Sequence, residues 1–218
     1  MTLKLPATTL VANCASAALF DATSAKVDRS ALEAAFRTII CWTGDDPNRD
    51  GLIETPARMA RALAEHFAGY AVDPAAILQK TFSEIAGYDE TIVLAGIPFV
   101  SHCEHHMAPI VGRAWVGYTP RGRVVGISKL ARVVDAFARR LQIQERMTAQ
   151  IAGAIEEALQ PEGVGVVLKA VHHCMSARGV HKPGVELVTS RMLGSFRDDP
   201  ETRKEFLRIA TSTPAAQA

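Results

Sequence analysis

The chain has 218 residues, of which 48% are hydrophobic and 22% charged, so it is long enough to bury a sizeable core. Its 24 basic and 23 acidic residues nearly cancel, and the overall charge therefore indicates neither a nucleic-acid partner nor a membrane surface. Any site for an anion must come from a local cluster of basic residues.

The N-terminal residues 1–26 are rich in Ala, Thr and Ser without periodicity, which predicts a flexible arm. The segment from Leu10 to Phe20 faintly resembles a signal peptide, but Asn13 and Ser16 interrupt it and a single Lys precedes it. No later stretch reaches the roughly 18 apolar residues that a membrane-spanning helix needs. We therefore expect a cytoplasmic protein with reduced thiols, with an exported protein as the alternative.

Residues 27–90 predict a helical N-terminal region. Asp28 is a candidate cap for a first helix, and the polar stretch TGDDPNRDG then predicts a loop. Thr55 is a candidate cap for a second helix, because Pro56 is favourable in the first helical position. Gly69 is expected to end that helix.

Residues 91–218 predict one domain in which strands and helices alternate in groups. Short β-branched or aromatic stretches bounded by Gly and Pro predict the strands, and apolar residues at helical spacing predict the helices. The expected strands are TIVLAGIPFV, GRAWVGYTP, RVVGI, GVGVVLKAVHH and VELVTSRML. Three helices are expected: one that begins at Ser128, one from Gln144 to Leu159 and one from Pro200 to Ile209. This order predicts an α+β fold with a mainly antiparallel sheet.

Two polar clusters, SHCEHHM and VHHCMSARG, combine scarce residue types at the ends of predicted strands. In a tight turn, Cys103 and His106 can face one ion while His105 points elsewhere, and Cys174 can supply a third ligand. A catalytic zinc site has three such ligands and one position open for water. Buried structural roles for these residues remain an alternative, and the ligand types do not exclude iron or cobalt.

Five stretches, ETPARM, CEHH, GISKLARVV, QIQERMT and VHHCMSARG, together resemble the GTP cyclohydrolase I family, in order, between about Ala31 and Ile209. The resemblance implies the tunnelling fold, an antiparallel sheet with two helices on one face, preceded by N-terminal helices. It also implies a zinc enzyme that opens the imidazole ring of GTP, releases formate and forms 7,8-dihydroneopterin triphosphate. That reaction is the first step of tetrahydrofolate or related pterin biosynthesis.

The resemblance also assigns roles to individual residues. It implies that Zn²⁺ is held by Cys103, His106 and Cys174, and that His105 and His172 transfer protons. It further implies a homodecamer with active sites between subunits. The implied substrate-binding residues, with Glu145 anchoring the guanine, are Glu145, Gln144, Ser128, Lys129, Arg132, Arg178 and Arg58.

Three other functions compete with this interpretation. One is an enzyme of the same fold that acts on a pterin or a deazaguanine, but such an enzyme would lack the combination of both clusters. Another is a non-catalytic zinc protein with a fully ligated structural metal. A zinc nucleobase deaminase fits less well, because the PCxxC element that would supply its cysteine ligands is absent.

Overall fold

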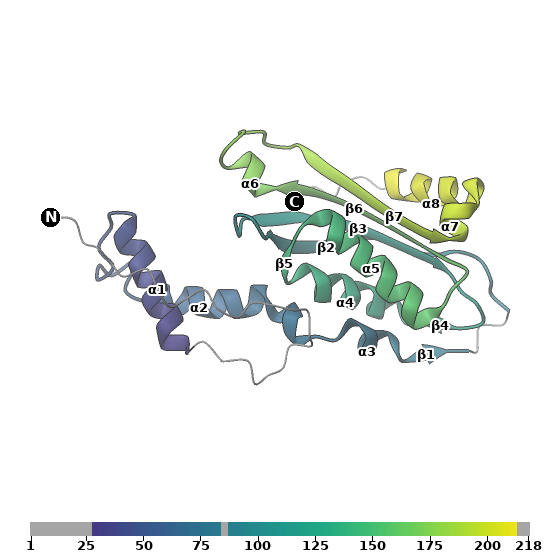
Figure 1. Ribbon diagram of the computed structural model, residues 1–218, viewed down its shortest axis with the longest axis horizontal. Coiled ribbons are helices and arrows are strands. Elements are labelled where there is room, and N and C mark those ends of the chain that lie inside the picture. The colour runs from purple at the N-terminus through teal and green to yellow at the C-terminus, as the bar shows by residue number, and fades with distance from the viewer. Residues whose placement is uncertain (1–27, 84–86, 213–218) are drawn as a thin grey trace, which may run out of the picture.

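The computed structural model describes residues 28–83 and 87–212, with side chains up to residue 210. The predicted arm at residues 1–26 lies outside the described residues. The elements shown in Figure 1 are α1 (Arg29–Trp42), α2 (Thr55–His66), η1 (Ala68–Ala71), α3 (Pro74–Leu78), β1 (Thr81–Phe82), β2 (Ile92–Cys103), β3 (Pro109–Thr119), β4 (Val124–Val125), α4 (Ile127–Ala138), β5 (Leu141–Gln142), α5 (Gln144–Leu159), β6 (Gly163–His172), α6 (His173–Ser176), β7 (Glu186–Gly194), α7 (Ser195–Asp198) and α8 (Pro200–Ser212).

The main sheet has the strand order β5-β2-β3-β6-β7. Its four long strands pair antiparallel, and only the two-residue β5 pairs in parallel, with β2. The expected α+β fold with a mainly antiparallel sheet is therefore confirmed. Because β3 runs opposite to both of its neighbours, β2 and β6 run in the same direction and end at the same edge of the sheet.

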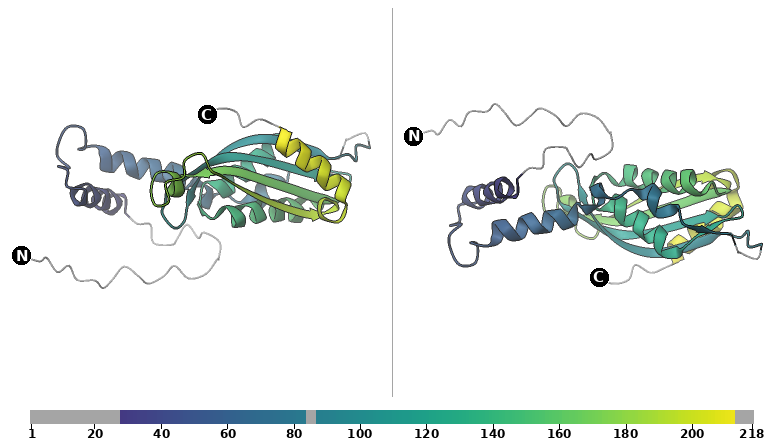
Figure 2. Two further views of the ribbon diagram at one scale, coloured as in Figure 1. Left: turned by 90° about the horizontal axis from the view of Figure 1, so that it is seen from above. Right: turned by 90° about the horizontal axis from the view of Figure 1, so that it is seen from below.

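Helices α4 and α5 cover one face of this sheet (Figure 2). Their apolar positions recur at helical spacing, so that Leu130 and Val134 of α4 and Ile151 and Ile155 of α5 are fully buried against the strands. Each such side chain contributes about 1.5–3 kcal/mol through burial. This layer fixes the first turn of α5 near the strand ends, where the polar clusters lie.

The opposite face of the sheet carries a smaller apolar cluster of Trp115, Val167, Phe196, Phe206 and Ala210. Here α7 lies on β6 and β7, and α8 lies on β2 and β6 (Figure 2). Gly165 permits this approach, because a Cβ atom there would lie 2.4 Å from the nearest ring atom of Phe196. The C-terminal segment therefore packs directly on the backbone of the central strands.

The N-terminal helices α1 and α2 pack against each other and extend from one end of the sheet (Figure 1). The predicted cap is confirmed, because the Asp28 carboxylate accepts a hydrogen bond from the Ser30 amide. The predicted Thr55 cap is wrong by one residue. Thr55 is the first helical residue, and Glu54 takes the cap position without a side-chain hydrogen bond, because the preceding turn leads directly into the helix.

The predicted end of α2 at Gly69 is also wrong, since the helix ends at His66 and Gly69 lies in the following 3₁₀ turn. Gly69 has a different reason to be glycine. Its amide donates to the Arg139 carbonyl, and a Cβ atom would lie 2.4 Å from the Ala136 carbonyl oxygen. The glycine therefore allows the N-terminal region to contact the end of α4.

The strand predicted for RVVGI is only partly correct. Only Val124 and Val125 are in strand conformation, and they pair with β1 rather than with the main sheet. Nearby, Leu78 of α3 is fully buried within the main core.

None of the helices in the described ranges combines the length and the apolar character that a bilayer crossing requires.

Candidate active site

The first polar cluster forms the tight turn between β2 and β3. The Met107 amide donates to the Cys103 carbonyl at 2.7 Å, the Cys103 amide donates to the Ala108 carbonyl at 2.8 Å, and Met107 has a φ of 52°. This turn brings both histidine rings close to the cysteine. The Cys103 Sγ lies 3.7 Å from the His105 Nδ1 and 3.9 Å from the His106 Nδ1, so His105 also faces the sulfur.

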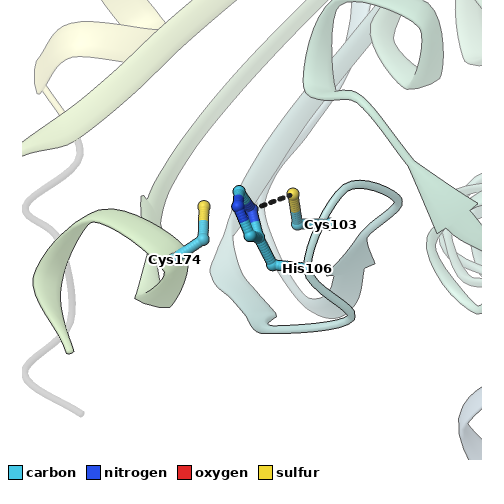
Figure 3. Close-up of side chains that lie close together, drawn as sticks. All are labelled: Cys103, His106 and Cys174. Carbon is cyan, nitrogen blue, oxygen red and sulfur yellow. Dashed lines mark hydrogen bonds between the residues drawn. The ribbon is translucent and has the colours of Figure 1, made fainter. Parts of the chain in front are cut away.

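The second cluster follows β6, and its short helix α6 holds Cys174. The two clusters meet because β2 and β6 end at the same edge of the sheet, with β3 between them. The potential ligand atoms of Cys103, His106 and Cys174 all lie within 4.8 Å of one another (Figure 3). The convergence predicted from the sequence is thus present in the structure.

These distances suit a metal ion. A tetrahedral zinc site with bonds of about 2.0–2.3 Å separates its ligand atoms by roughly 3.3–3.8 Å, so small side-chain movements would complete it. Burial raises the pKa of the Cys174 thiol, and the neighbouring Cys103 sulfur raises it further. Two sulfurs that oppose each other's ionisation in this way favour a cation between them.

A cavity of about 430 Å³ adjoins the three ligands, within the usual size range of small-molecule sites. Its wall includes His105, His172, Gln144 and Glu145, all of them expected site residues. Burial lowers the pKa of His172, while the nearby Glu145 carboxylate opposes that shift. The cavity therefore contains a metal-ligand set, two histidines and an acidic side chain.

The sequence model of the family described as GTP cyclohydrolase I matches residues 32–211 of this chain. The chain belongs to the GTP cyclohydrolase I family. It is 50% identical over 188 residues to "GTP cyclohydrolase 1" of Maricaulis maris (strain MCS10), a match covering 86% of this chain and 92% of that protein. It is 49% identical over 184 residues to "GTP cyclohydrolase 1" of Brucella abortus (strain S19), covering 84% of this chain and 86% of that protein.

Among solved structures, the chain resembles an archaeosine synthase QueF-Like in the apo form with a TM-score of 0.39 and 20% identity. That match covers 49% of this chain and 94% of the other. The fold itself, a mainly antiparallel sheet with two helices on one face and N-terminal helices before it, is the tunnelling fold expected of a GTP cyclohydrolase I.

The GTP cyclohydrolase I family is zinc-dependent, and the residues present fit this metal. Two cysteines and one histidine are donors that zinc prefers. In the part of the chain that the structure describes, no fourth Cys, His, Asp or Glu joins this group. Three protein ligands beside an open cavity are typical of a catalytic zinc site rather than of a structural one.

The expected phosphate-binding residues lie apart from the cavity of their own chain. Ser128 and Lys129 are in the first turn of α4, which follows β4 at the opposite end of the sheet from α6 (Figure 1). Arg58 is on α2, where it pairs with Glu54 at 2.5 Å. Arg178 lies close enough to the ligands for its charge to act on the Cys174 thiol. Within the described residues, the wall of the cavity includes none of Ser128, Lys129, Arg132, Arg178 or Arg58.

The structure also contains site residues that the sequence does not predict. Gln142 and Leu187 line the cavity, and Arg146 forms an ion pair with Glu104 of the tight turn. Arg146 also donates to the Leu141 carbonyl at 3.3 Å. The ion pair joins the turn to the start of α5. Its sequence signal is weak, because an arginine and a glutamate 42 positions apart belong to no spacing rule.

Proposed function

We propose that this chain converts GTP to 7,8-dihydroneopterin triphosphate with release of formate, the first step of tetrahydrofolate or related pterin biosynthesis. The convergence of Cys103, His106 and Cys174 beside a cavity, in a member of the GTP cyclohydrolase I family, is the observation that carries this conclusion. A structural zinc site would need no such cavity.

Cys103, His106 and Cys174 would hold the zinc ion at the end of the cavity. When bound, zinc acts as a Lewis acid and makes a water molecule nucleophilic near neutral pH. The carbon attacked lies between the two nitrogens of the guanine imidazole ring. This ring must therefore lie next to the three ligands, which line the cavity.

Proton transfer to the departing ring nitrogen is assigned to His105 and His172, which both line the cavity. The lowered pKa of His172 favours its neutral ring, which can accept a proton and return it. Because ring opening, loss of formate and the later ring closure all move protons, two histidines in one cavity are suited to the sequence of steps.

Glu145 is assigned to base recognition. It lies in the first turn of α5, where the helix dipole stabilises a carboxylate, and it lines the cavity. Its two oxygens can accept hydrogen bonds from the ring N–H and the exocyclic amine of guanine. Adenine presents an acceptor in place of that ring N–H, and it would leave one carboxylate oxygen unpaired.

The triphosphate is assigned to Ser128, Lys129, Arg132, Arg178 and Arg58. Since the α4 residues lie at the far end of the sheet from the cavity, a neighbouring chain must supply them. Both long edges of the sheet support such assembly, because β7 and most of β2 have no further strand partner within the described chain. We infer a homo-oligomer, as a decamer, with active sites between subunits.

The test is incubation of the purified, zinc-loaded protein with GTP. We expect formate release in equal amount to a fluorescent pterin after oxidation, and no product with ATP. Removal of zinc by a chelator should abolish both products, and zinc addition should restore them. Retained turnover in fully metal-free protein would contradict the proposal.

A further inference from the structure

The side chain of Gln144 connects the sheet to His172. It is fully buried at the first position of α5. Its Nε2 lies 3.2 Å from the Leu168 carbonyl oxygen, 3.0 Å from the Leu187 carbonyl oxygen and 3.1 Å from the Thr189 Oγ1. Its Oε1 lies 2.8 Å from the Nε2 of His172. All polar atoms of this amide are thus occupied by protein partners.

The orientation of the Gln144 amide follows from its partners. Backbone carbonyl oxygens only accept hydrogen bonds, so the atom that faces Leu168 and Leu187 must be the NH₂ group. The reversed amide would place its oxygen against two carbonyl oxygens in a buried site, a contact between acceptors with no hydrogen between them. The Oε1 atom is therefore fixed toward His172.

The hydroxyl groups of Thr148 and Thr189 support the same orientation of the Gln144 amide. Thr148 Oγ1 donates to the Gln144 carbonyl at 2.7 Å and lies 2.7 Å from the Thr189 Oγ1. Because Thr148 uses its one proton on that carbonyl, Thr189 donates to Thr148 and is left to accept from the Gln144 amide. Each hydroxyl proton thus has one acceptor, whereas a flipped amide would take the Thr189 proton for its own oxygen and leave the 2.7 Å contact between the two hydroxyls without a proton.

We propose that Gln144 is a positioning residue that holds neutral His172 as the tautomer with its proton on Nε2. An amide oxygen can only accept, so the Nε2 that faces it must carry a hydrogen. The Nδ1 then bears the lone pair, and it has no hydrogen-bond partner among the residues with described side chains. The tautomer follows from the hydrogen bonds alone, and only the catalytic use of the Nδ1 lone pair rests on the proposed function.

In the proposed reaction, His172 then exchanges its catalytic proton at Nδ1 alone. Nδ1 accepts a proton to give the imidazolium and returns it to give the neutral ring, while the other proton stays on Nε2, which donates to the Gln144 Oε1 throughout. No net charge or proton is left on Gln144. The amide therefore acts through His172, because both of its N–H donors face acceptors of the sheet and its threonine, and its oxygen faces the His172 ring.

The tautomer can be observed directly by neutron diffraction from crystals of the zinc-loaded full chain, without substrate. At about pH 8.5 an ordinary histidine is neutral. We expect deuterium on Nε2 of His172, none on Nδ1, and the ND₂ group of Gln144 directed at the two carbonyls. Deuterium on Nδ1 with a bare Nε2 would overturn the inference, whether or not the protein turns over GTP.

Kinetics of Gln144→Met provide the second test, since methionine fills a similar volume and offers His172 only the weak acceptor of a thioether sulfur. We expect kcat about 10- to 100-fold lower, with the KM for GTP and the zinc content within about twofold of the original protein. The matched control, Thr189→Val, removes one partner of the amide and leaves both carbonyl anchors, so kcat should change by less than about threefold.

A Gln144→Met protein with raised KM and unchanged kcat would instead show that Gln144 binds the substrate directly, and it would overturn the positioning role. The two tests separate this inference from the proposed function. Absence of GTP turnover in the original protein would refute the proposed function alone, and the neutron result would still decide the tautomer. The neutron experiment also does not depend on whether Gln144→Met folds.

Discussion

Glu145 lines the cavity, and we propose that its carboxylate recognises the base. In Glu145→Gln, one carboxylate oxygen becomes an NH₂ group, which would face a donor of guanine instead of accepting from it. Loss of a buried polar pairing of this kind costs about 1–3 kcal/mol or more. We expect kcat/KM for GTP to fall by at least about 100-fold, measured by formate release, with zinc content unchanged.

The matched control is Glu157→Gln on the exposed face of the same helix. This change removes an equal charge from α5 without touching the cavity, so kcat/KM should stay within about twofold. Equal decreases of kcat/KM in the two variants would mean that the charge of the helix, and not a contact with the base, controls turnover of GTP.

At this scale the sequence predicts residue types well and hydrogen-bond networks poorly. The ligand set of Cys103, His106 and Cys174 follows from scarce residue types placed in turns after strands, and the structure brings their ligand atoms together. The expectation that His105 points away from the ligands is wrong, because the turn is tight enough to direct both rings at the cysteine. The role of Gln144 depends on backbone carbonyls of β6 and β7, which no sequence pattern displays.

Among the elements, the packing of α7 and α8 on the sheet depends on the absence of a side chain at Gly165. In Gly165→Ala the new methyl group would lie 2.4 Å from Phe196 and 2.8 Å from Phe206. Overpacking of this kind costs about 1–3 kcal/mol. We expect a lower melting temperature in thermal unfolding, with the metal site intact.

Gly153→Ala on α5 is the companion variant, because a Cβ atom there meets nothing within 4 Å. Alanine is the better helix former by about 1 kcal/mol, so its melting temperature should be equal or higher. A melting temperature for Gly165→Ala that matches that of Gly153→Ala would refute close packing at the sheet.

The elements that the sequence predicts best are those whose apolar periodicity faces a continuous core. Helix α5 begins at Gln144 and ends at Leu159, as predicted, because its buried positions recur over the whole length. The start and end of α2 are less well predicted. Its boundaries depend on the turn before Thr55 and on the contact of Gly69 with α4, and both are set by tertiary structure.

For the whole molecule, the distance between Lys129 and the cavity within one chain predicts that two chains build each site. Neither Cys174→Ser nor Lys129→Ala should turn over GTP as the sole chain of an oligomer. When the two variants are co-expressed and assemble together, some sites combine intact residues from both. Random mixing at equal amounts should restore about a quarter of the original activity per site.

Mixed assemblies that stay inactive would mean that Lys129 serves the cavity of its own chain. The control is to mix the two variants after each has assembled separately, which should restore nothing unless subunits exchange. Oligomeric state measured by light scattering should accompany both arms. The sequence alone predicts this arrangement only through the family resemblance, because nothing in one chain's pattern says which residues meet across an interface.

The most direct test of the central claim compares zinc content and GTP turnover in the original protein and in Cys174→Ser. Two cysteines from remote segments and one histidine should hold one zinc per chain, and the original protein should release formate from GTP. Cys174→Ser should lose both the metal and the product, while Cys41→Ser, which alters an exposed cysteine of α1, should keep both. Full zinc occupancy together with normal turnover in Cys174→Ser would contradict the account.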